Sequence, residues 1–191
     1  LSAIQDLKIT TSGSTDLSQG SLISDANLQV QSQGITVDQG KVSAKRINLN
    51  AGTAQLSTKN GDILATDTSG TDVLTINSEG LDNSLGRISS NGDMRINAGT
   101  TGALTSDDGN INALGNINIT AGDINNNRGN IKANKSIAVQ GQATNNNQGT
   151  IQAGDQLAIT TGNLTSQGGT IIGLNQVTIT SAQLDNSNNA V

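Results

Sequence analysis

A pattern of Gly, any residue and Ile recurs every 20 residues through the second half of the chain, starting at Gly109, Gly129, Gly149 and Gly169. A pair of aliphatic residues two positions apart keeps the same spacing, at Ile117/Ile119, Ile137/Val139, Leu157/Ile159 and Val177/Ile179. A fixed period of this length is typical of a solenoid, in which each repeat buries its apolar face only against its neighbours.

Within one repeat, apolar and polar residues alternate, as in Ile117-Asn118-Ile119-Thr120. This alternation predicts short strands with the aliphatic side chains on one face and Asn on the other. Gly115 and Gly122 lie where the strands must turn, and a further inward aliphatic position recurs at Leu104, Ile124, Leu164 and Leu184. Because the 3.6-residue period of helical solenoids is absent, the sequence predicts an all-β fold, a parallel β-helix of about nine coils of roughly 20 residues.

The coils over residues 1–80 are less regular than those over residues 81–191. The third repeat is longer than its neighbours, and the extra residues fall in a polar stretch at 65–72, which we expect to protrude as a loop. Because the chain starts and stops within a repeat, we expect residues 1–191 to form a single β-helix segment from the interior of a longer protein. Open strand edges at its ends predict end-to-end association.

Two residue pairs test the register of the predicted coils. Stacking at a spacing of 20 places Asp108 under Arg128 and Lys135 under Asp155, so that opposite charges meet. Asn triplets at 125–127 and 145–147 are also one period apart. Stacked amides can form hydrogen-bonded ladders, and Asn tolerates the left-handed conformation of a tight corner.

Composition excludes several classes of function. Nucleic-acid binding needs a basic face and usually aromatic residues, whereas this chain has a net charge of −5 and no Phe, Trp or Tyr. No run of about 20 apolar residues is present, so the segment is not expected to insert into a membrane. The absence of cysteine suits a polypeptide that crosses a membrane pore unfolded.

Catalytic and metal sites are also disfavoured. Asp107 and Asp108 are adjacent, so their side chains point to opposite faces of a strand and form no glycosidase-like pair. Without His or Cys, the usual general bases and thiol nucleophiles are missing. A shared cation between Asp67 and Asp72 is a minor alternative to a solvated loop. We therefore predict no enzyme, cofactor or metal, with a polysaccharide-acting β-helix enzyme as the remote alternative.

The repeat over residues 81–99, LDNSLGRISSNGDMRINAG, resembles the haemagglutinin repeat of filamentous haemagglutinins. The four following units resemble degenerate copies, and residues 1–80 match more loosely. These exoproteins are exported by two-partner secretion in Gram-negative bacteria. The resemblance implies a right-handed parallel β-helix, displayed at the cell surface or secreted, and an outer-membrane transporter as the partner during export.

Two branches of the family remain open, an adhesin and the stick of a contact-dependent growth inhibition effector. In both, the resemblance implies a stiff rod that positions receptor-binding or toxin modules away from the producing cell. The alternative is that this segment itself binds a host glycan or a bacterial outer-membrane receptor.

Two places are candidates for binding such a partner. The first is the insertion, because loops on rigid scaffolds often carry recognition; its candidate residues are Asp67, Ser69, Thr71 and Asp72. The second surrounds Ile172 and Leu174, aliphatic residues on outward positions that earlier coils fill with Asn, Lys, Gln or Gly. For these two, isolated surface exposure and a local register shift at Gly168-Gly169 are the alternatives.

Overall fold

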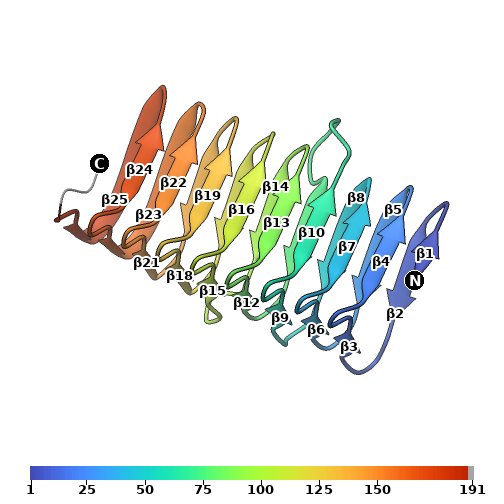
Figure 1. The fold of residues 1–191 in the computed structure, drawn as a ribbon. Helices are drawn as coiled ribbons and strands as arrows, with labels where there is room; N and C mark the ends of the chain where they lie inside the picture. The colour runs from blue at the N-terminus through green and yellow to red at the C-terminus, as the bar shows by residue number, and fades with distance from the viewer. Residues whose placement is uncertain (189–191) are drawn as a thin grey trace.

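The computed structural model describes residues 1–188, and all regular elements in that part of the chain are β-strands. The strands stack in parallel as successive coils of one tube, and Figure 1 shows the coils following one another from the N-terminus to the C-terminus. The predicted parallel β-helix is confirmed, since one of its sheets contains nine strands, one from each coil.

Each coil has three faces. The first face is formed by β1 (Ser2–Ala3), β4 (Ser21–Ser24), β7 (Lys41–Ala44), β10 (Asp62–Ala65), β13 (Arg87–Ser90), β16 (Asn110–Ala113), β19 (Asn130–Ala133), β22 (Thr150–Ala153) and β24 (Thr170–Gly173). The second is formed by β2 (Leu7–Thr10), β5 (Asn27–Gln31), β8 (Arg46–Asn50), β11 (Leu74–Asn77), β14 (Met94–Asn97), β17 (Ile117–Thr120) and β20 (Ile137–Gln140).

The third face has short strands: β3 (Thr15–Asp16), β6 (Ile35–Thr36), β9 (Leu56–Ser57), β12 (Leu81–Asp82), β15 (Leu104–Thr105), β18 (Asp123–Asn125) and β21 (Ala143–Asn145). In the last two coils, β23 (Gln156–Thr165) and β25 (Gln176–Asp185) run through both the second and the third face. No helix long and apolar enough to cross a membrane occurs among residues 1–188.

The core is a set of aliphatic columns that run along the tube. Ile111 pairs with Ile131 and then with Ile151, and Ile117 pairs with Ile137 and then with Leu157, as the 20-residue period predicts. These side chains are almost completely buried. The third column differs at two places, since Thr15 precedes Ile35 at its start and Thr144 occupies the position between Ile124 and Leu164.

The predicted insertion is present, but its bounds differ slightly from the expectation. Ala65 ends β10 and pairs with Ala44 and Ser90, so the loop covers residues 66–73, and Figure 1 shows it extending beyond β10. A second irregular connection, at 98–103, was not predicted. Alternation stops at both places because extra residues enlarge a corner without changing the strands beside it.

Glycine at the start of the first face is required by close packing. A Cβ at Gly129 would lie 2.0 Å from the carbonyl oxygen of Ser106 on the preceding coil. The left-handed corner residue is its neighbour, and this column holds Gln19, Gln39, Asn60, Leu85, Asp108, Arg128, Gln148 and Gly168. The expectation that the Asn triplets supply the left-handed residue is therefore wrong, since residues 125–127 and 145–147 do not have positive φ.

Candidate functional site

The insertion at 66–73 is fixed to the rod by Arg46, a residue of β8. The Arg46 guanidinium donates to Asp67 Oδ2 at 2.8 Å, to the Ser69 carbonyl at 2.6 Å and to the Thr71 carbonyl at 3.3 Å. Asp67 also accepts hydrogen bonds from the backbone and hydroxyl of Ser69. These hydrogen bonds from Ser69, together with the charge of Arg46, hold the pKa of the Asp67 carboxyl below its usual value. Arg46 therefore fixes three residues of the loop, Asp67, Ser69 and Thr71, against the rod.

Asp72 closes the other end of the insertion. Its Oδ1 accepts a hydrogen bond of 3.1 Å from Nε of Arg95, on β14. Asp67 and Asp72 therefore bind two different arginines, an arrangement that favours the interpretation without a shared cation. No cluster of three or more His, Cys, Asp or Glu residues that could hold a metal ion occurs in the described part of the chain.

A polar hollow of about 330 Å³ lies beside the insertion; it is lined by Thr68, Gly70, Thr71, Asn91, Gly92, Asp93, Leu114, Gly115 and Lys135. The Asp93 carboxylate in this hollow accepts hydrogen bonds from the backbone and side chain of Asn116. Thr71 and Lys135 are exposed. Of the first candidate set, Asp67 and Asp72 are thus occupied by arginines, whereas the side chain of Thr71 is open to a partner.

Ile172 and Leu174 lie far from the insertion, on the last strand of the first face and at the corner after it. Ile172 pairs with Gln152 on the outward track, as predicted, and Thr150 pairs with Thr170. A register shift at Gly168-Gly169 is therefore excluded. Leu174 is 67% exposed and Ile172 is partly buried. Because β24 lies five strands away from β10 in the sheet, the two residues do not form a binding site with the insertion.

A shallow furrow on the second face was not predicted from the sequence. Two neighbouring hollows of about 340 and 220 Å³ share Asn118, Ala138 and Ala158 along their floor. One wall carries Thr120, Gln140 and Thr160, and the other carries Asn116, Ser136 and Gln156. The sequence feature that could have indicated the furrow is a small Ala at the same outward position of two successive coils. The residues that line the furrow are uncharged.

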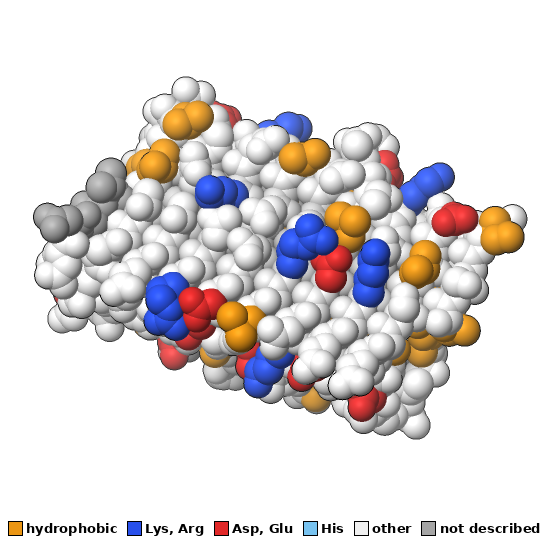
Figure 2. Space-filling view, viewed as in Figure 1, with side chains coloured by type: hydrophobic (Ala, Val, Ile, Leu, Met, Phe, Trp, Pro, Cys, Tyr) orange, Lys and Arg blue, Asp and Glu red, His pale blue; other side chains and the backbone are white. Residues whose placement is uncertain are grey.

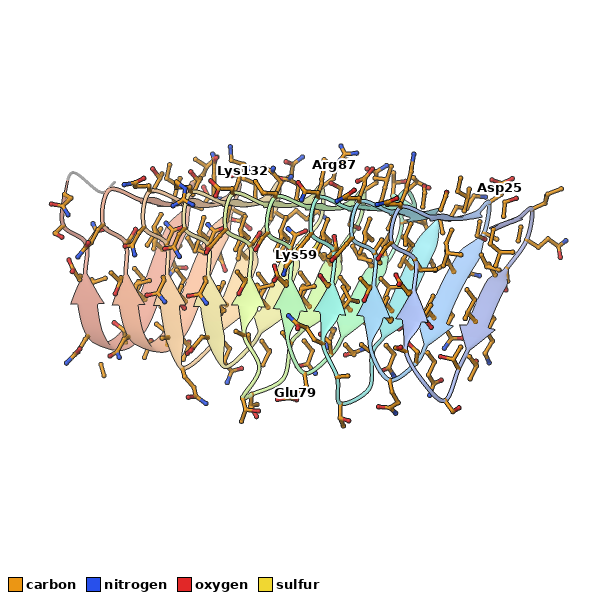
Figure 3. The ribbon with its side chains drawn as sticks, turned by 60° about the horizontal axis from the view of Figure 1, so that its bottom comes forward. Asp25, Lys59, Glu79, Arg87 and Lys132 are labelled. Atoms are coloured by element: carbon orange, nitrogen blue, oxygen red, sulfur yellow. The ribbon has the colours of Figure 1, made fainter. Side chains whose placement is uncertain are left out.

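Charged side chains are distributed unevenly along the rod. Figure 2 shows Lys and Arg over the middle and N-terminal coils, and no basic residue follows Lys135 in the sequence. In Figure 3, Arg87 and Lys132 lie along one edge of the rod, whereas Glu79 lies on the opposite edge. Glu79 accepts a hydrogen bond from the hydroxyl of Thr101, in the second irregular connection.

The adjacent carboxylates do not form a catalytic pair. Asp107 accepts hydrogen bonds from the backbone and side chain of Asn127, and Asp108 pairs with Arg128. Lys135 and Asp155 are stacked as predicted, because the Asp155 backbone donates to the Lys135 carbonyl. The Asp155 carboxylate, however, binds Asn175 and Ser136. Asparagine amides thus bind four carboxylates that arginine does not, those of Asp6, Asp93, Asp107 and Asp155.

Comparison with protein families agrees with the fold. A model of the haemagglutinin repeat matches residues 5–97, 68–148 and 131–191, which together span nearly the whole chain. Searches of curated proteins and of solved structures found no match. The repeats and the β-solenoid are those of a filamentous, adhesin-like segment of the kind found in extracellular and cell-surface proteins. The chain belongs to the haemagglutinin repeat family.

Proposed function

We propose that this segment is a stiff extracellular spacer of a two-partner-secretion exoprotein from a Gram-negative bacterium. It holds receptor-binding or toxin modules at a distance from the producing cell, in adhesion or in contact-dependent growth inhibition. Its partner during export is the outer-membrane transporter of the same system. The absence of cysteine is compatible with passage through that transporter as an unfolded chain.

The observation that carries this proposal is the unbroken stack of coils. Neighbouring strands of the first face pair in register from β1 to β24. Each coil adds about 4.8 Å to the length of the rod, because that is the separation of hydrogen-bonded strands. Bending such a rod would open backbone hydrogen bonds and the continuous aliphatic core on one side, so the stack resists bending.

Ion pairs along the outside add to this resistance. All five salt bridges found among residues 1–188 join neighbouring coils: Arg46–Asp67, Lys59–Asp82, Arg87–Asp62, Arg95–Asp72 and Arg128–Asp108. Each pair is partly exposed, so solvent screens the charges and each pair contributes little to stability. Their common direction along the rod supports a mechanical role more than a chemical one.

An in-frame deletion of two coils tests the spacer. Removing residues 109–148 joins Asp108 to Gly149. Gly149 occupies the position that Gly109 has two coils earlier, so the register is kept. The shortened rod should lose about 10 Å of length and retain adhesion or growth inhibition. Removing only residues 109–118 breaks the register and serves as the disruptive control. If the two-coil deletion folds but abolishes function, the segment binds a partner itself and the spacer role is wrong.

The pinned insertion favours a second candidate function, in which this segment binds a receptor. A rigid loop raised from a flat rod loses little conformational entropy on binding, which favours recognition. Thr71→Arg should weaken receptor binding without changing the melting temperature. Gln148→Arg is the matched control, because Arg128 already occupies that column one coil earlier. Unchanged binding of the Thr71 variant to target cells would exclude the loop as the receptor-binding site.

A further inference from the structure

A column of buried polar side chains runs inside the rod at the corner between the third and first faces. Its members are Thr58, Asn83, Ser106, Asn126, Asn146 and Ser166, and each has 0% of its surface exposed. Leu17 and Val37 occupy the same column in the first two coils. The fold therefore accepts an aliphatic residue at this position. The shape of the corner alone does not explain why the later coils have polar residues there.

Each asparagine in the column donates to the following coil. Asn126 Nδ2 lies 2.7 Å from Asn146 Oδ1 and 3.0 Å from the Thr150 carbonyl oxygen. Asn146 Nδ2 lies 3.3 Å from Ser166 Oγ and 3.1 Å from the Thr170 carbonyl oxygen. Asn83 Nδ2 repeats the pattern, at 3.1 Å from Ser106 Oγ and 3.2 Å from the carbonyl oxygen of Asn110. These contacts form only when neighbouring coils are in one particular register.

The column is not fully satisfied. Asn126 Oδ1 is buried and has no hydrogen-bond partner in the structure. A partly satisfied buried polar network is a poor way to gain stability, because an apolar core of the same shape avoids the cost of desolvation. The column is thus better suited to disfavouring misaligned stackings of the coils than to stabilising the native stacking.

The alternative that most needs exclusion is a slip of two residues between coils. A slip of one residue turns every side chain to the other face of the strand and is strongly penalised. A slip of two keeps aliphatic residues inside, since Ile117 would then lie beside Val139 instead of Ile137. The same slip would place Asn126 beside Thr144 or Gln148 and leave buried amides unpaired, which is costly.

We propose that this buried polar column is a register lock, which makes each coil stack on the next in a single alignment and contributes little to net stability. A slip would rotate the outward columns of one part of the rod against the other. The lock therefore keeps the insertion, the furrow and any attached module facing in fixed directions.

Engineered cysteine pairs can measure the register directly, because the natural chain contains no cysteine. Lys132 and Gln152 are register partners on β19 and β22, and Lys132 is labelled in Figure 3. Cα atoms of such partners are about 4.8 Å apart, within disulfide range. The shifted pair, Lys132 with Thr150, is about 8 Å apart and outside that range.

The test compares Lys132→Cys/Gln152→Cys with Lys132→Cys/Thr150→Cys, each with and without Asn126→Leu/Asn146→Leu. With the natural asparagines, only the in-register pair should oxidise, to more than about ten times the yield of the shifted pair. With both asparagines replaced by leucine, we expect an unchanged or raised melting temperature and a rise of at least about tenfold in the shifted disulfide. Asn126→Ser/Asn146→Ser introduces the residue type that Ser106 and Ser166 have in the same column, and it should give an intermediate yield of the shifted disulfide.

Two outcomes would overturn the proposal. If the leucine variant folds and still forms only the in-register disulfide, the aliphatic columns alone determine the register. If the leucine variant fails to fold or melts far below the natural protein, the column is a source of stability instead. Replacing Ile117 and Ile137 by leucine is the matched control, since it changes the core shape but no hydrogen bond and should leave the disulfide pattern unchanged.

Discussion

Arg128 lies one coil above Asp108, and their side chains form an ion pair with two hydrogen bonds on the outside of the rod. Nε donates to Oδ1 at 2.9 Å and Nη2 donates to Oδ2 at 2.7 Å. Both residues occupy the left-handed corner column, with φ of 55° and 57°. Their shared backbone conformation aligns the two side chains along the axis, so the guanidinium meets both carboxylate oxygens.

This pair predicts a pH dependence of stability. The hydrogen bonds from Arg128 lower the pKa of Asp108 below its ordinary value of 3.8. A carboxylate with a lowered native pKa stabilises the fold above the pKa of the unfolded chain, and this contribution is lost as the pH falls through the native value. The natural protein should melt above Asp108→Asn at pH 6, and the difference should vanish in strong acid. Arg128→Gln should match Asp108→Asn, and the double variant should lose no more; a difference that persists at pH 2 would contradict the assignment.

Ile137→Asp should unfold the rod. Ile137 is 1% exposed and stacks between Ile117 and Leu157, so the variant places an unpaired charge in the aliphatic core at a cost of about 4 kcal/mol or more. The control is Ala138→Asp on the same strand, because Ala138 points outward and is exposed. Circular dichroism should show loss of β-structure or a much lower melting temperature for the first variant only.

Gly129→Ala should destabilise the rod through a steric clash. The new methyl group would lie 2.0 Å from the Ser106 carbonyl oxygen and 2.5 Å from Asn126 Oδ1, and the expected cost is about 1–3 kcal/mol. Gly168 is the contrasting case, because it lies in the left-handed column with φ of 64° and its Cβ would meet only ordinary contacts, the nearest at 3.4 Å. Gly168→Asn should be neutral or stabilising in chemical denaturation, since Asn tolerates this conformation. Equal effects of the two variants would refute the distinction.

Thr144→Val should stabilise the protein. The Thr144 side chain is fully buried in the aliphatic column between Ile124 and Leu164, and its hydroxyl has no hydrogen-bond partner. Replacing an unpaired buried hydroxyl by a methyl group of similar size should raise the free energy of unfolding by about 1 kcal/mol. Thr160→Val is the surface control and should change it by less than about 0.5 kcal/mol. A destabilised Thr144 variant would mean that the hydroxyl has a partner after all.

The insertion shows which features of the molecule the sequence alone does not reveal. The excess length of the third repeat located the loop, but nothing in its sequence indicated that Arg46 and Arg95, from coils on either side, would hold Asp67 and Asp72. The connection at 98–103 was missed because it lengthens a repeat by fewer residues. The furrow was missed because the alternation places Ala138 and Ala158 on the outward face but does not indicate how deep the surface is above them.

The sequence by itself determined the parallel coils, their register and the aliphatic columns. In a solenoid each coil touches only its neighbours, so the contacts recur at a constant separation along the chain, and a period such as that of Ile111, Ile131 and Ile151 is enough to find them. Only the tertiary structure decided what happens at the corners. There, the amide of Asn126 bonds to the following coil inside the rod, and Gly129 packs against the preceding coil. Direction at a corner depends on the exact backbone path, and a period of two residues contains no information about it.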